Sequence, residues 1–69
     1  MMRKRSVRVA GHPTSITLED AFWAALKEGA ARRNTSLTAL IDEIDAGRGD
    51  SGLSSAIRVW ALQEARRGG

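Results

Sequence analysis

The stretch "TSITLEDAFW", Thr14–Trp23, joins two patterns with no loop between them. Polar and apolar side chains alternate over Thr14–Leu18, which indicates a strand with Ile16 and Leu18 on one side. Acidic residues follow at once, and apolar residues then recur at helical spacing. Because backbone N–H and C=O groups of a strand need partners, the first question is what Thr14–Leu18 pairs with.

The first helix is expected to begin near Thr17 and Asp20, which stand three residues apart as in a capping box. Asn34 can adopt the left-handed conformation that ends a helix. Gly29 lies on the apolar side of this helix, where it costs about 1 kcal/mol relative to Ala. The sequence gives no functional reason for this glycine, and close approach of a neighbouring helix is one structural explanation.

Two more helices are predicted after Asn34. Ser36 is a good N-cap for the second helix, and the stretch 47–50, "GRGD", ends it. The third is expected from Leu53 to about Arg66, with apolar residues on one stripe. The predicted order is therefore strand, helix, helix, helix.

A chain of 69 residues is one domain at most. A chain this short buries only about 60% of its unfolded surface, so it usually relies on disulfides, a metal or a second copy. The sequence has no Cys, and His12 is its only His. Self-association therefore remains. Within the chain, the only candidate partner for the strand Thr14–Leu18 is the weakly alternating segment 6–10. The strand can also pair antiparallel with the same strand of a second chain, and we favour this second possibility.

Positive charge is concentrated at the start of the chain. The net charge is +3, and residues 1–18 contain bases but no acid. These bases are Arg3, Lys4, Arg5 and Arg8. A basic segment is typical of a polyanion binder, although it also suits a solvated tail. We expect residues 1–13 to form a basic arm or an additional short strand, and residues 14–69 to form the folded domain.

The sequence contains no segment that predicts membrane insertion. Its longest purely apolar run, Ala21–Leu26, is far shorter than the roughly 20 residues that span a bilayer. A membrane-surface role is disfavoured because the charge lies mostly outside the helices. We therefore expect a cytoplasmic protein.

From Ser15 to Ile44 the chain resembles the ribbon-helix-helix family of bacterial DNA-binding repressors. The resemblance is carried by "TSITL", by "EDAFWAALKEGAARRN" and by "TSLTALIDEI". The chain also looks like a small bacterial subgroup with a basic N-terminal segment and an added C-terminal helix. This resemblance implies a mainly α fold in which one strand from each protomer of a homodimer forms a ribbon that enters the DNA major groove.

The resemblance also implies roles for particular residues. Pro13, Ser15 and Thr17 match the base-facing positions, and the Ser36 hydroxyl with the N–H groups of Leu37 and Thr38 would bind a phosphate. The expected dimer core comprises Ile16, Leu18, Phe22, Leu26, Leu40, Ile41 and Ile44. Family members often place a long Arg, Lys, Gln or Asn on the reading face, whereas this strand has short hydroxyls. Arg3, Lys4, Arg5 and Arg8 are expected to compensate by binding phosphates or lying in a groove.

Catalysis finds little support in the sequence. Acid–base and nucleophilic mechanisms need converging groups in a pocket, and this chain has one His and no Cys. It has no GxGxxG or P-loop pattern, so we expect no enzyme activity, cofactor or metal. The alternative to a repressor is a protein-interaction module, such as an antitoxin or adaptor. In that case Leu53, Ile57 and Trp60 would dock on a protein partner.

Overall fold

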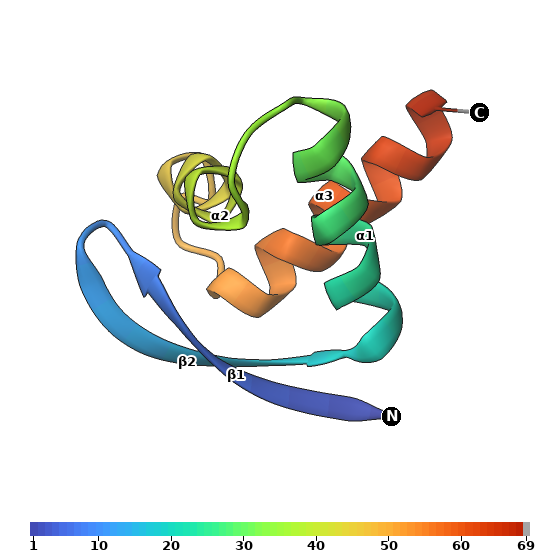
Figure 1. The fold of residues 1–69 in the computed structure, drawn as a ribbon. Coiled ribbons are helices and arrows are strands. Elements are labelled where there is room, and N and C mark those ends of the chain that lie inside the picture. The colour runs from blue at the N-terminus through green and yellow to red at the C-terminus, as the bar shows by residue number, and fades with distance from the viewer. Residues whose placement is uncertain (69) are drawn as a thin grey trace.

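The structure, a computed structural model, describes residues 1–68. Two strands come first, β1 (Met2–Val9) and β2 (His12–Glu19). Three helices follow: α1 (Asp20–Arg32), α2 (Leu37–Ala46) and α3 (Leu53–Gly68). The hairpin forms one layer and the helices pack together on one side of it (Figure 1). None of the helices in the described part of the chain is long and apolar enough to cross a membrane.

The partner of β2 lies in the same chain. β1 and β2 form a two-stranded antiparallel sheet whose register runs from Val9 opposite His12 to Met2 opposite Glu19. Most of the basic N-terminal segment is therefore a strand, and residues 6–9 of the weaker candidate partner belong to it. β1 occupies only one of the two edges of β2, so the other edge is open to a second chain. Pairing of β2 with the β2 of a second chain remains a prediction.

A tight turn joins the two strands. Ala10 and Gly11 both have positive φ, 53° and 82°, as a two-residue type I′ turn requires. This conformation is costly for Ala10, and Asp42 on α2 stabilises it by accepting a 2.8 Å hydrogen bond from the Ala10 N–H. Pro13 lies opposite Arg8, one position beyond the pair that closes the turn. In an antiparallel ladder this position makes no hydrogen bond between the strands, so the missing N–H of Pro13 costs nothing there.

Four predicted helix ends are confirmed, at Asn34, Ser36, Gly47 and Leu53, and one is wrong. Asn34 has φ 54° at the end of α1, and the Ser36 Oγ caps α2 by accepting from the Ala39 N–H at 3.0 Å. The N-cap of α1 is Glu19, and its side chain makes no cap hydrogen bond. The predicted capping box is therefore wrong, because Thr17 is still part of the extended strand β2.

The hydrophobic core lies between the hairpin and the helices. Of the residues expected in a dimer core, six are buried within the single chain and Phe22 is half-buried against them. The six are Ile16, Leu18, Leu26, Leu40, Ile41 and Ile44. Ile57 of α3 is 0% exposed in the same core. Its predicted place on a partner surface is therefore wrong, because α3 folds back on its own chain.

The unexplained Gly29 allows α1 and α3 to approach closely. A Cβ at this position would lie 2.4 Å from Cη2 of Trp60, so no larger residue fits without a shift of the indole. Arg33 covers the Trp60 ring at 5.4 Å from its centroid and donates to Glu64 at 3.0 Å. Trp60 is thus held between the two helices rather than extended toward a partner.

Candidate nucleic-acid interface

The two faces of the hairpin carry different side chains. In an antiparallel pair, residues directly opposite each other point to the same side of the sheet. The pairs on the outward side are Met2 with Glu19, Lys4 with Thr17, Ser6 with Ser15, and Arg8 with Pro13. The pairs on the side of the helices are Arg3 with Leu18, Arg5 with Ile16, Val7 with Thr14, and Val9 with His12. We call the first set the outward face and the second set the inward face.

The outward face brings the three candidate base-reading residues together. Pro13, Ser15 and Thr17 lie along β2, and all three are exposed. Next to them on β1 lie Lys4, Ser6 and Arg8, which are also exposed. Between Lys4 and Arg8 this surface therefore presents short hydroxyl groups flanked by two cations. Contact of these residues with DNA remains a prediction.

Lys4 and Arg8 are available for a ligand. Neither side chain forms an ion pair with an acid within residues 1–68. Arg8 Nη1 donates to the Gly11 carbonyl oxygen at 3.2 Å, which holds the side chain near the turn and leaves its other N–H donors free. Glu19 at the far end of this face is already paired with Arg58, at 2.8 Å.

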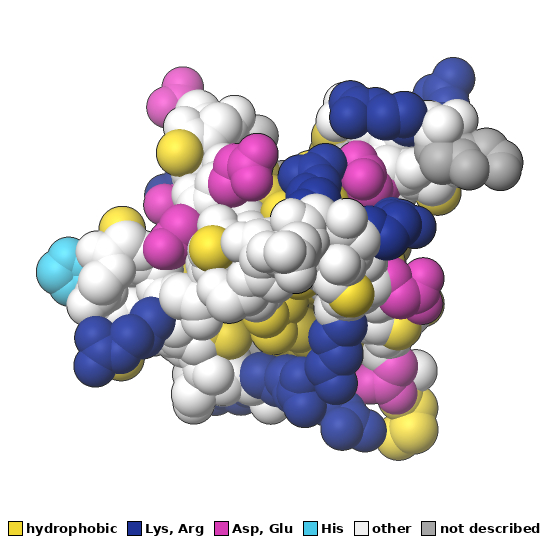
Figure 2. Space-filling view, turned by 45° about the horizontal axis from the view of Figure 1, so that its top comes forward, with side chains coloured by type: hydrophobic (Ala, Val, Ile, Leu, Met, Phe, Trp, Pro, Cys, Tyr) yellow, Lys and Arg dark blue, Asp and Glu magenta, His cyan; other side chains and the backbone are white. Residues whose placement is uncertain are grey.

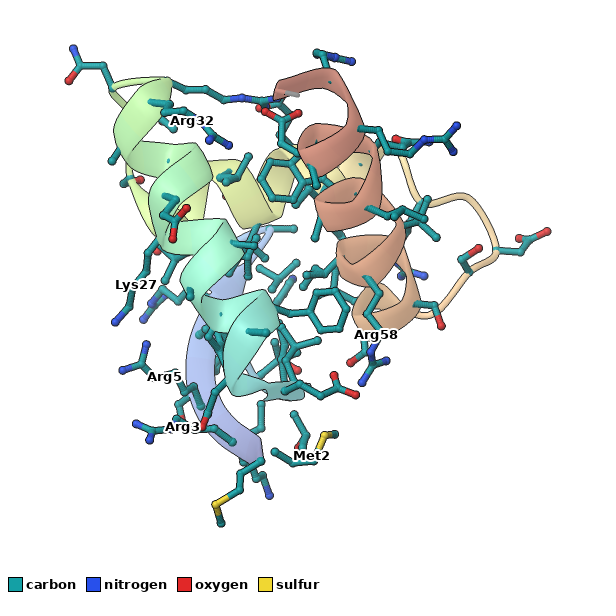
Figure 3. All side chains as sticks on the ribbon, turned by 90° about the vertical axis from the view of Figure 1, so that its right-hand side faces the viewer. Met2, Arg3, Arg5, Lys27, Arg32 and Arg58 are labelled. Atoms are coloured by element: carbon teal, nitrogen blue, oxygen red, sulfur yellow. The ribbon has the colours of Figure 1, made fainter. Side chains whose placement is uncertain are left out.

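Arg3 and Arg5 lie on the other side of β1 and are attached to α1. Arg3 Nε lies 3.3 Å from Asp20 Oδ1, and the Arg3 carbonyl oxygen accepts from Trp23 Nε1 at 2.9 Å. Arg5 covers the Trp23 ring at 5.6 Å. Figure 3 shows Arg3, Arg5 and Lys27 along one side of the molecule, pointing away from the core. The four bases of the expected arm or additional short strand are thus divided between the two faces of β1.

Charge is unevenly distributed over the molecular surface. Groups of Lys and Arg side chains lie along the lower part of the view in Figure 2, where the hairpin is. Over the helices in the same view, acidic side chains lie among further Lys and Arg side chains, whereas residues 1–18 contain no acid. The hairpin side is therefore the better match for a polyanion.

The start of α2 has the features of an anion site. Ser36 Oγ is engaged with the Ala39 N–H, so the hydroxyl hydrogen remains free to donate. The N–H groups of Leu37 and Thr38 have no partner within the helix, as at any helix N-terminus. Thr38 is exposed and Leu37 is half-buried. The phosphate role of this end of α2 remains a prediction.

The outer side of α3 carries apolar residues that sequence analysis missed. Val59 is 53% exposed and Leu62 is 58% exposed, and they stand three residues apart on one helical stripe. Val59 lines a groove of about 390 Å³ between α2 and α3, together with Ile44 and Trp60 among others. Leu53 and Trp60 are half-buried against the core. Val59 and Leu62 form a second apolar stripe on α3. Helical spacing alone does not show which of the two stripes is buried, and the fold does.

One carboxyl near the hairpin is electrostatically perturbed. The pKa of the Glu19 carboxyl is below its ordinary value because its own backbone N–H donates to it and because Arg58 also donates. This ion pair joins the end of β2 to α3. Among the described residues, His, Asp and Glu form no cluster suited to a metal ion.

The sequence matches a family model described as a ribbon-helix-helix domain over residues 2–65. The match includes β1, β2, α1 and α2 in full, and most of α3. No curated protein and no solved structure matches the chain.

Proposed function

This chain belongs to the ribbon-helix-helix family, and we propose that it is a transcriptional regulator that binds double-stranded DNA through the outward face of its hairpin. The observation that carries this proposal is the row of exposed hydroxyl groups between Lys4 and Arg8, two cations with no acidic partner in the described chain. Domains of this family are typically DNA-binding regulators or antitoxins without enzyme activity.

The dimensions of the hairpin support insertion into DNA. Neighbouring strands lie about 4.8 Å apart, and the major groove, about 12 Å wide, admits a two-stranded ribbon. Ser15 and Thr17 are then close to the base edges. The N-terminus of α2, with the Ser36 hydroxyl, binds a backbone phosphate. Phosphate contacts supply much of the affinity, and the ribbon supplies the sequence preference.

We propose that the regulator acts as a homodimer on an inverted repeat, as a repressor in a bacterial cytoplasm. Ribbon-helix-helix proteins typically bind DNA as dimers, and an operator with two-fold symmetry matches a two-fold dimer. Two surfaces of the chain are open to a second copy. These are the unpaired edge of β2 and the stripe that contains Val59 and Leu62.

The test is selection of bound duplexes from random DNA, at low and at near-physiological salt, with the mass of the complex measured by light scattering. We expect an inverted repeat at the higher salt and two chains on each duplex. Nonspecific binding by cations weakens steeply with salt. Binding that disappears at the higher salt and leaves no motif would contradict the proposal.

A second candidate is an interaction module of the antitoxin or adaptor type. The exposed Val59 and Leu62, and the groove between α2 and α3 that Val59 lines, favour it. The double variant Val59→Ser, Leu62→Ser distinguishes the possibilities, because both side chains are more than half exposed in the single chain. If this variant becomes monomeric, the stripe is the dimer interface of the unmodified protein. The stripe is then not available to a different protein partner, which argues against the interaction module.

A further inference from the structure

Three cations lie along one side of the molecule, apart from the outward face of the hairpin: Arg3 and Arg5 of β1 and Lys27 of α1. Trp23 connects the two elements, because its indole donates to the Arg3 carbonyl and its ring lies beneath the Arg5 guanidinium. Lys27 follows Trp23 by one helical turn. All three cationic side chains point away from the core on this side (Figure 3). We call Arg3, Arg5 and Lys27 the basic flank.

The basic flank carries more positive than negative charge. Asp20 lies 3.3 Å from Arg3 Nε and balances one cation. Within residues 1–68, Arg5 and Lys27 form no ion pair. The neighbours of Lys27 on the helix surface, three and four residues away, are a tryptophan and three alanines, and Glu28 points about 100° away around the helix. Two positive charges of the flank are therefore left for a ligand.

The two arginines of the flank are held in positions that suit a phosphate group. The Arg5 guanidinium lies 5.6 Å from the centroid of the Trp23 ring, and this contact through its face leaves its in-plane N–H groups free to donate. Arg3 has five N–H donors, more than the single carboxylate of Asp20 accepts. A planar guanidinium matches two phosphate oxygens, and a side chain that is already positioned loses less conformational entropy on binding.

β1 lies at the wall of the major groove if the β2 strands of two chains form the ribbon. A strand spacing of about 4.8 Å puts each β2 axis about 2.4 Å, and each β1 axis about 7 Å, from the centre of such a ribbon. The groove is about 12 Å wide, so its walls stand about 6 Å from that centre. The cations of β1 are therefore beside the phosphates. The open edge of β2 is across the hairpin from β1, so a second chain paired there leaves the flank uncovered.

We propose that the basic flank binds the sugar–phosphate backbone of DNA at the edge of the groove, with Lys27 of α1 contacting a phosphate beside those held by Arg3 and Arg5. This inference rests on the proposed DNA binding. It adds Lys27, which the sequence did not single out, and gives the protein a phosphate-binding surface that spans β1 and α1. Contacts of this kind supply affinity and orientation, and they do not distinguish sequences.

The first experiment compares Lys27→Gln with Arg66→Gln. Lys27 is exposed and forms no ion pair within the described chain, so its replacement leaves the fold intact. Arg66→Gln is the matched control, because it removes one positive charge from the last turn of α3, far from the hairpin (Figure 1). Affinities for the selected operator and for unrelated DNA are measured from low to near-physiological salt.

We expect Lys27→Gln to weaken all duplexes alike. The slope of log affinity against log salt should become shallower by about 0.9, the value of one phosphate contact, and Arg66→Gln should leave it unchanged. An unchanged slope in Lys27→Gln, or an equal effect of Arg66→Gln, would overturn the inference while DNA binding stands. A loss confined to the operator would mean that Lys27 reads a base, which also overturns it. If the unmodified protein binds no DNA, the proposed function fails as well.

Asp20→Asn changes the charge of the flank in the opposite direction. It removes the negative charge beside Arg3 and leaves the whole guanidinium to the DNA. We expect all duplexes to bind several-fold more tightly at low salt, and this gain to shrink as salt screens the charges. A gain in affinity cannot result from misfolding. Unchanged or weaker binding by a variant whose circular dichroism matches that of the unmodified protein would overturn the inference.

The last experiment locates the contact on the DNA. A series of operator duplexes carries one neutral methylphosphonate each, in place of successive phosphates along the groove. The unmodified protein should lose affinity at several of these positions. Lys27→Gln should lose nothing further at one of them, because the contact is already absent. If every methylphosphonate weakens Lys27→Gln as much as it weakens the unmodified protein, Lys27 contacts no phosphate, and the inference is overturned.

Discussion

Leu18 and Thr17 are neighbours in β2, yet they belong to two surfaces with different tasks. Leu18 is 0% exposed against the helices, whereas Thr17 is exposed on the outward face. The same alternation divides β1, where Arg3 and Arg5 contact α1 while Lys4 and Arg8 face solvent. Packing thus constrains the inward face. The outward face packs against no helix in the single chain, so its side chains are not constrained by packing and can be suited to binding a ligand.

Replacing one residue on each face should show that the inward face contributes far more to the free energy of unfolding than the outward face does. Leu18→Ala removes a fully buried side chain and should lower the free energy of unfolding by about 2–5 kcal/mol, which is most of what so small a core supplies. Thr17→Val keeps the β-branched shape and should change it by less than about 0.5 kcal/mol. Urea unfolding followed by circular dichroism measures both. Equal losses in the two variants would mean that the two faces are not distinct.

The packed side can be tested at its tightest point. Gly29→Ala places a methyl group against Trp60 and should lower the free energy of unfolding by up to about 2 kcal/mol. This is the cost of overpacking less the gain in helix propensity. Gly52→Ala is the control, because nothing lies within 4 Å of a Cβ there. A stabilised Gly29→Ala variant would show that Trp60 moves aside at no cost.

The hairpin tip connects the two faces, since it positions the outward face by a contact with α2. Asp42→Ala removes the acceptor for the Ala10 N–H and should lower the free energy of unfolding by about 1 kcal/mol. Hydrogen exchange at the tip amides should become faster. Asp42→Asn keeps an acceptor oxygen and should restore protection, and Glu43→Ala is the neighbouring control. If hydrogen exchange at the tip amides is unchanged in Asp42→Ala, the turn is stable without the hydrogen bond to Asp42.

The smallest effect concerns acid. Because its pKa is lower in the folded chain, the Glu19 carboxyl stabilises the fold at pH values above its unfolded pKa, about 4.3. This contribution is lost as the pH falls through the lower, folded pKa. The stability difference between the unmodified protein and Glu19→Gln should therefore shrink below about pH 4. Thermal unfolding at several pH values measures it, with Glu28→Gln as control. A difference that does not vary with pH would show that the Arg58 pair contributes nothing.

The local elements were largely predictable because their causes are local. Alternation identified β2, helical spacing identified the three helices, and Asn34 and Ser36 marked helix boundaries that the structure confirms. The capping box failed for a related reason. Thr17 and Asp20 have the right spacing, but strand pairing keeps Thr17 extended, and backbone pairing outweighs a cap worth about 1 kcal/mol.

The candidate interface was predictable only in part. Pro13, Ser15 and Thr17 share a face because alternation alone requires it. Lys4, Ser6 and Arg8 join them only through the register, which depends on the positive φ of Ala10. In a sequence, a two-residue hairpin turn is usually indicated by Asn-Gly or Asp-Gly, and Ala-Gly is a weaker signal. The sequence therefore left open whether the four bases lie in an arm or in an additional short strand.

By itself, the sequence determined the positions and periods of β2 and the three helices, the caps at Asn34 and Ser36, and the concentration of positive charge near the N-terminus. The tertiary structure alone decided that β2 pairs with β1, which stripe of α3 is buried, and why residue 29 is glycine. The reason is physical. Periodicity says which side of an element is apolar, but the partner that covers it is chosen by contacts between residues far apart in the chain, such as Asp42 with Ala10 and Gly29 with Trp60.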